Sequence, residues 1–103
     1  DLVLLDTIEP ITDHEVIRVA KQNPKPGDLV VSYGYAYSGP LLRFTRTVAG
    51  YADGWMVLDG PLAAGMSGGA VVNLNGELVG VNQAANEVVG LTCTTEEIRD
   101  FLK

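Results

Sequence analysis

One serine of this chain is surrounded by glycines, in the run Gly65-Met66-Ser67-Gly68-Gly69. Glycines permit a tight, irregular backbone that bulkier residues would not tolerate. A loop of this kind can expose the Ser67 hydroxyl and point successive N–H groups into one concavity, where they would stabilise the oxyanion of an acyl-transfer reaction. The alternative is an ordinary glycine-rich turn. The run therefore indicates either a nucleophilic serine or a structural turn.

Other reactive side chains give weaker signals. The chain's one histidine, His14, lies in a polar stretch, where a solvated histidine is the expected role. Its one cysteine, Cys93, lies in an apolar run typical of a small buried side chain, without neighbours that would activate a thiolate. Asp59 precedes Gly60-Pro61, which favours a turn residue over a functional carboxylate. No Cys/His cluster has metal-ligand spacing, so we expect no metal and no cofactor.

The composition bounds the classes of protein to consider. The 103 residues suffice for one domain, and with 47% hydrophobic and 19% charged residues the chain is of the folded, globular kind. Thirteen acidic residues against seven scattered basic ones give a net charge of −6, which argues against a nucleic-acid partner. No run of about 18 apolar residues is present, so we expect no membrane-spanning helix. The single cysteine excludes an internal disulfide, and the sequence gives no indication of the cellular compartment.

Short apolar runs, punctuated by twelve glycines, predict strands. A terminal helix and several strands together indicate an all-β domain, either an antiparallel barrel or a sandwich. The dipeptide Asn75-Gly76 predicts a type I′ hairpin turn. The expected strands cover residues 1–8, 29–35, 42–49, 55–58, 70–73, 77–82 and 88–93.

Two segments carry helix-start signals. Thr94 followed by Glu97 fits a capping box, which predicts a short helix over residues 95–103. A similar pattern begins at Thr12, but the β-branched residues that follow it are equally compatible with an extended chain. The conformation of residues 16–22 is therefore left open between helix and strand.

The serine run and its flanks resemble a known family. Residues 65–69 resemble the nucleophile loop of trypsin-like serine proteases of the chymotrypsin fold, and the flanking sequence is similar to that of HtrA-type and related bacterial members. Residues 70–82 resemble the hairpin that follows the serine, and residues 26–34 resemble the first strand of the second barrel. Residues 1–5, with Pro10, resemble the strand that begins with the triad aspartate. The resemblance implies a six-stranded antiparallel Greek-key barrel with a short C-terminal helix.

The resemblance also implies roles for individual residues. Ser67 would be the nucleophile and Asp1 the carboxylate that orients the histidine, and the N–H groups of Gly65 and Ser67 would form the oxyanion hole. The family's histidine lies upstream of the aspartate, so we expect it outside this chain. The implied function is the nucleophile-bearing half of a serine endopeptidase, inactive as this fragment. The alternative is a catalytically silent barrel module that binds peptides or self-associates.

The family register places a substrate-binding pocket around five residues. Pro61 occupies the position of trypsin's pocket-floor aspartate, so no preference for Lys or Arg is implied. Leu62, Ala85 and Gly90 favour a modest apolar pocket for a small or medium aliphatic side chain. Gln83 lies in the segment that would pair with an extended substrate backbone.

The same register divides the chain. Residues 1–10 would be the last strand of a missing N-terminal barrel, residues 11–25 the connection between barrels, and residues 26–103 the C-terminal barrel with its helix. A barrel without its partner exposes an apolar face, which favours association. The expected partners are therefore a peptide or protein substrate, the histidine-bearing barrel and a second copy of the chain.

Overall fold

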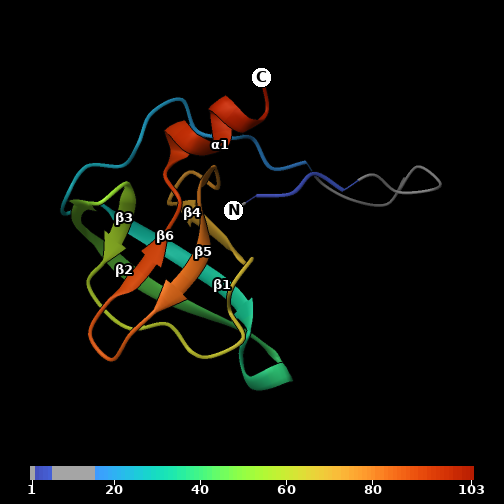
Figure 1. Cartoon of the computed structure of the whole chain (residues 1–103), viewed down its shortest axis with the longest axis vertical. Helices are drawn as coiled ribbons and strands as arrows, with labels where there is room; N and C mark the ends of the chain where they lie inside the picture. Colours follow the sequence, from blue (N-terminus) through green and yellow to red (C-terminus); the bar gives the residue numbers. More distant parts are fainter. Residues whose placement is uncertain (1, 6–15) are drawn as a thin grey trace.

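Six strands in the described part of the chain close into one antiparallel barrel, in the order β1-β2-β3-β6-β5-β4 (Figure 1). The computed structural model describes residues 2–5 and 16–103. This strand order, with β1 beside β4 and β3 beside β6, is the Greek-key arrangement, so the predicted fold class is confirmed. The elements are β1 (Leu29–Tyr35), the 3-10 turn η1 (Ala36–Ser38), β2 (Leu41–Ala52), β3 (Trp55–Leu58), β4 (Ala70–Asn73), β5 (Leu78–Ala85), β6 (Gly90–Thr92) and α1 (Thr95–Phe101).

Alternating side chains fill the barrel interior. In β1, Val30 and Ser32 point inward and are fully buried, whereas Leu29 and Tyr35 are exposed. Burial of an apolar side chain of this size contributes about 1.5–3 kcal/mol to folding. The largest fully buried apolar side chains are Met56, Leu58, Met66, Val30, Val48, Val71 and Val79.

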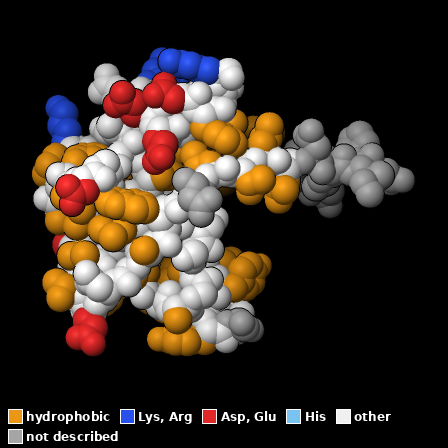
Figure 2. Space-filling view, in the orientation of Figure 1, with side chains coloured by type: hydrophobic (Ala, Val, Ile, Leu, Met, Phe, Trp, Pro, Cys, Tyr) orange, Lys and Arg blue, Asp and Glu red, His pale blue; other side chains and the backbone are white. Residues whose placement is uncertain are grey.

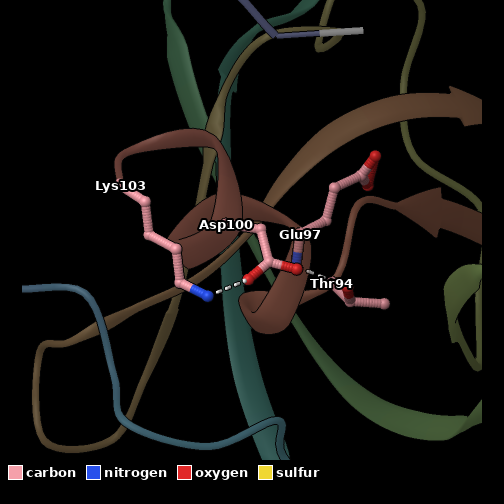
Figure 3. A network of polar contacts seen from close by, with 4 residues as sticks. All are labelled: Thr94, Glu97, Asp100 and Lys103. Atoms are coloured by element: carbon pink, nitrogen blue, oxygen red, sulfur yellow. Dashed lines mark hydrogen bonds and ion pairs between the residues drawn. The ribbon is translucent and has the colours of Figure 1, made fainter.

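The C-terminal helix begins at the predicted cap. The Thr94 hydroxyl oxygen accepts a hydrogen bond from the Glu97 N–H at 3.0 Å, as Figure 3 shows beside the exposed Asp100–Lys103 ion pair of 3.1 Å. Ile98 is buried against the barrel. The helix ends at Phe101, two residues before the predicted end, and the side chains of Phe101 and Leu102 are exposed.

The segment before β1 lies along the barrel as extended chain. Val19 forms a parallel bridge with Leu78, in which the Ala20 N–H donates to the Leu78 carbonyl at 2.9 Å. The Arg99 guanidinium of α1 donates to the Ala20 carbonyl at 2.9 Å. Of the two conformations left open for residues 16–22, the helix is not formed: Val19 pairs as a strand residue does, and Lys21 and Gln22 form a bend. The expected helix start at residues 12–15 lies outside the described residues.

Residues 2–5 form no regular secondary structure. Val3, Leu4 and Leu5 are 68–81% exposed, and the segment of residues 2–5 leads away from the barrel (Figure 1). Hydrophobic side chains gather on this side of the surface in Figure 2. The expected strand at residues 1–8 is thus unpaired over its described part. Residues 1 and 6–15 lie outside the described residues, so the division at residues 10, 11–25 and 26 stays a prediction.

The β4–β5 turn differs from the predicted type. A type I′ turn needs positive φ at both central residues, but of the pair only Gly76 has it, at 78°. The Asn73 side-chain oxygen accepts from the N–H groups of Asn75 and Glu77 at 3.0 and 2.9 Å, and the Gly76 N–H donates to the Asn73 carbonyl. This side-chain bonding widens the loop to residues 74–76, so the prediction of a type I′ turn was wrong.

Candidate active site around Ser67

Residues 65–69, the Ser67 loop, lie in the connection between β3 and β4. Met66 anchors this loop, because its side chain is 1% exposed and packs in the barrel core. Ser67 itself lies at the surface. The Gly69 N–H closes the loop by donating to the Met66 carbonyl at 3.0 Å. A buried anchor therefore holds an exposed serine beside it.

The Ser67 hydroxyl donates a hydrogen bond to the Gln83 carbonyl at 2.9 Å. Gln83 is the extra residue of a β-bulge, because the pairing of β5 with β6 shifts register between Asn82 and Ala84. A bulge takes its residue out of the regular ladder, so this carbonyl is turned to the neighbouring loop. Sequence analysis assigned Gln83 to substrate binding, which stays a prediction, and the structure shows that the Gln83 carbonyl also holds the Ser67 hydroxyl.

Asn82, which sequence analysis did not single out, holds the Ser67 loop by hydrogen bonds from the buried side. Its side chain is 1% exposed and donates to the carbonyls of Tyr33 and Met66, at 3.0 and 3.1 Å. Its backbone continues the support, since the Gly68 N–H donates to the Asn82 carbonyl at 2.7 Å and the Asn82 N–H donates to the Gly69 carbonyl at 2.9 Å. One residue of β5 thus contacts the loop at three points.

At two positions of the loop, only glycine fits without a steric clash. Gly65 has a φ of 91°, and a Cβ there would lie 2.8 Å from the Tyr35 carbonyl oxygen. A Cβ at Gly69 would lie 1.9 Å from the Tyr33 carbonyl oxygen. The loop is therefore pressed against β1, and larger residues at these positions would displace it.

The N–H groups of the loop fall into two sets. Those of Met66, Gly68 and Gly69 donate to backbone carbonyls at 3.3, 2.7 and 3.0 Å. Those of Gly65 and Ser67 have no hydrogen-bond partner among residues 2–5 and 16–103. Gly65 and Ser67 border the same cavity. These are the two residues that the resemblance assigned to the oxyanion hole.

A cavity of about 220 Å³ adjoins Ser67. Of the residues assigned to substrate binding, Leu62 and Ala85 line it, whereas Pro61, Gln83 and Gly90 do not. On the other side of the loop, Ser67 borders a more open hollow of about 400 Å³. The residues lining the cavity are Leu62, Ala63, Ala64, Gly65, Met66, Ser67, Asn82, Ala84, Ala85 and Asn86.

Pro61 and Gly90 contact other parts of the barrel and do not line the cavity. The Pro61 carbonyl accepts a hydrogen bond from the Arg46 guanidinium at 2.8 Å. A Cβ at Gly90 would lie 2.9 Å from the Leu62 Cγ, so the buried Leu62 side chain fills the space over Gly90. Leu62 therefore both lines the cavity and covers Gly90.

The other reactive side chains have structural roles. Asp59 accepts a hydrogen bond from the Thr47 N–H at 2.9 Å and fixes the end of the β2–β3 pair. Cys93 is buried, and burial raises the pKa of its thiol, which disfavours the thiolate. Both placements agree with the structural interpretations of the sequence.

Two residues of the predicted site are not placed. Asp1 and His14 lie outside the described residues. Within the described ranges, no three His, Cys, Asp or Glu side chains gather in a way that could hold a metal ion. Over the same ranges, no helix has both the length and the apolar character to cross a membrane.

A Greek-key barrel with an exposed serine on a glycine-rich loop defines the class of trypsin-like barrels. A family model described as the trypsin-like peptidase domain matches residues 1–81. The chain belongs to this family.

Two relatives agree with the assignment. The chain is 30% identical over 94 residues to a probable periplasmic serine protease do/HhoA-like of Haemophilus influenzae, covering 82% of this chain and 20% of that protein. It superposes on an HtrA-type protease AlgW solved with a decapeptide, with a TM-score of 0.76 at 16% identity, covering 90% of this chain and 34% of the other. The chain therefore spans a fifth to a third of these relatives.

Proposed function

We propose that this barrel carries the nucleophile of a serine endopeptidase, with Ser67 as that nucleophile. The observation that supports the proposal most is the pairing pattern of the Ser67 loop. The N–H groups of Gly65 and Ser67 are without partners in the described chain, while the three other N–H groups of the loop are bonded. Two donors beside an exposed hydroxyl are what a tetrahedral oxyanion requires.

The proposed reaction uses the hydroxyl and these donors in turn. A general base takes the Ser67 proton as Oγ attacks the peptide carbonyl carbon, and the carbonyl oxygen, now negative, accepts from the Gly65 and Ser67 N–H groups. The C–N bond breaks, the amine leaves with the proton, and an acyl-enzyme remains. Water then attacks the ester and releases the acid. The Ser67 hydroxyl must first exchange its bond to the Gln83 carbonyl for one to the base.

The base and its orienting carboxylate complete the proposal. The resemblance assigns the carboxylate to Asp1 and the base to a histidine upstream of it. The described residues place no imidazole beside Ser67. A serine with its oxyanion hole but without its base keeps only about 10³–10⁴-fold acceleration over water. We therefore expect residues 1–103 alone to be nearly inactive.

The substrate would be an extended peptide that passes on both sides of Ser67. The cavity that Leu62 and Ala85 help to line is small, about 220 Å³, so it would take a small or medium side chain on the acyl side. The open hollow beyond the loop leaves space for the leaving-group side. The related HtrA-type structure was solved with a decapeptide, which supports a peptide as the ligand here.

The alternative function is a catalytically silent module that binds peptides or self-associates. The bond from the Ser67 hydroxyl to the Gln83 carbonyl favours it, because a carbonyl cannot take the serine proton. Such a module would retain the cavity and have no need of a base.

Fluorophosphonate labelling read by intact mass separates the two functions. On the protein expressed from its own gene, the proposal expects rapid labelling at one site, abolished by Ser67→Ala. Labelling that survives Ser67→Ala would contradict the proposal, and a folded protein without any labelling would favour the silent module. A His14→Ala variant then shows whether the base lies within residues 1–103.

A further inference from the structure

The Asn82 amide is fully engaged in a buried site beneath the Ser67 loop. Both of its N–H groups donate, one to the Tyr33 carbonyl and one to the Met66 carbonyl, and its oxygen accepts from the Ser32 hydroxyl at 2.7 Å. Asn82 and Ser32 are 1% and 0% exposed. A buried amide with these partners has one orientation, because any rotation would leave buried polar groups unpaired.

The bond to the Met66 carbonyl has a consequence for the next N–H. The Met66 carbonyl and the Ser67 N–H belong to one peptide unit, which is planar and trans, so the two groups point in opposite directions. The carbonyl points inward to the Asn82 amide and the Gly69 N–H, at 3.1 and 3.0 Å. The Ser67 N–H must therefore point away from these buried groups.

We propose that Asn82 is a positioning residue, which holds the Met66–Ser67 peptide so that the Ser67 N–H faces the cavity. The role in catalysis rests on the proposed function, in which this N–H binds the oxyanion. The orientation of the peptide does not depend on it. Asn82 touches no reacting atom and acts through the peptide plane.

Hydrogen exchange of the Gly69 amide reports this orientation directly. Its N–H donates to the same Met66 carbonyl, so a rotation of the peptide exposes it. The Val48 N–H, bonded to the Asp28 carbonyl at 2.9 Å, serves as a reference amide away from the loop. The ratio of the two exchange rates separates a local change from a loss of global stability.

Two variants remove the donors and one control keeps them. Asn82→Asp loses both N–H donors, since a carboxyl group donates at most one O–H and none when ionised. Asn82→Ala also loses both and serves if the acid prevents folding. Ser32→Ala removes the hydroxyl on the amide oxygen and leaves both donors to the backbone. We expect the Gly69-to-Val48 ratio to rise about tenfold in the Asn82 variants, the loss of about one hydrogen bond, and to stay at the wild-type value in Ser32→Ala.

Two results would overturn the proposal. One is an unchanged ratio in the Asn82 variants, which would mean that the loop holds itself. The other is an equal rise in Ser32→Ala, which would mean that any buried polar loss loosens the loop.

A labelling experiment tests the catalytic part. In a protein that fluorophosphonate labels, Asn82→Ala should lower the maximal labelling rate about a hundredfold, as loss of an oxyanion donor does, and leave the half-saturating reagent concentration unchanged. An unchanged maximal rate would contradict the role in catalysis. If the wild-type protein is not labelled but the exchange ratio responds, the positioning role stands and the proposed function fails.

Discussion

The hydroxyl of Ser67 is bonded to the carbonyl of Gln83, at 2.9 Å, rather than to a base among the described residues. The carbonyl is available because Gln83 is the bulged residue of β5, next to Asn82, whose amide holds the Met66 carbonyl. Two successive residues of one strand thus fix the hydroxyl and the peptide plane of the same serine. This support belongs to the barrel itself, so the loop can keep its shape without a histidine beside it.

Substitution of Gly69 should disrupt the Ser67 loop. Gly69→Ala would place a Cβ 1.9 Å from the Tyr33 carbonyl oxygen, and the backbone on one side must move. We expect a loss on the order of 3 kcal/mol in the free energy of unfolding, measured by urea denaturation. Gly54→Ala is the matched control, because Gly54 has a φ of 82° but open space around it, and it should cost about 1–2 kcal/mol. Equal losses in the two variants would refute the close packing of the loop against β1.

Substitution of Leu62 should deepen the cavity. Leu62→Ala removes the side chain that fills the space over Gly90, at a cost of about 2–4 kcal/mol in stability. In a protein that reacts with peptidyl phosphonates, the variant should gain reactivity toward a phenylalanine analogue relative to a valine analogue. The ratio of second-order inactivation rates measures this, and Leu74→Ala, at an exposed leucine outside the cavity lining, is the control. An unchanged ratio would show that Leu62 does not limit the pocket.

Sequence patterns predicted most of the barrel, because strands with alternating or wholly apolar residues can be recognised from the residue types alone. Residues 29–35 and 55–58 were predicted with the bounds of β1 and β3. The end of β5 was missed, since Ala84 and Ala85 do not continue an alternation of apolar and polar residues. They belong to the strand because they pair with β6. The turn type failed because the Asn73 side chain bonds two N–H groups of the loop, which the Asn-Gly pair does not reveal.

The site was predictable in part for a similar reason. The Ser67 loop has a glycine pattern that is legible from residue types alone. Asn82 was missed because a buried amide in a strand has no local signature, and its partners Ser32 and Met66 lie 50 and 16 positions away. The one available signal was a polar residue at an inward position of a strand. The assignment of Pro61 and Gly90 to substrate binding stays a prediction, and that Leu62 covers Gly90 could not be read from the register.

Removal of the helix cap should cost a modest amount of stability. Thr94→Ala leaves the Glu97 N–H without its side-chain acceptor, and we expect a loss of about 1 kcal/mol, read from thermal or urea unfolding. Thr94→Ser keeps the hydroxyl and should retain most of the stability. If serine loses as much as alanine, the methyl group rather than the cap would be responsible.

The stability of the barrel should fall at alkaline pH. Burial raises the pKa of the Cys93 thiol above its ordinary value of 9.0, an effect to which the Glu97 charge adds. The folded chain therefore holds this proton more tightly than the unfolded chain, and the resulting stability is complete below the unfolded pKa and is lost as the pH rises through the folded pKa. Burial, with the Asp28 charge, raises the pKa of Tyr51 above 10.0 and acts in the same direction at higher pH.

Urea unfolding between about pH 7 and pH 10.5 measures this effect. The free energy of unfolding should decline above about pH 9 more steeply for the wild type than for Cys93→Ala, which has no thiol to titrate. Tyr51→Phe should flatten the curve only at the upper end. Parallel curves for the wild type and Cys93→Ala would show that the thiol makes no such contribution.

Trapping of the acyl-enzyme tests the central claim most directly. The protein expressed from its own gene is mixed with an activated ester of N-acetyl-valine, quenched in acid and digested, and the peptide that contains Ser67 is weighed. The account predicts an added N-acetyl-valyl group on Ser67, formed in a burst and absent from Ser67→Ala. The absence of an acyl group on Ser67 of the folded protein, whether or not the ester is hydrolysed, would contradict the account.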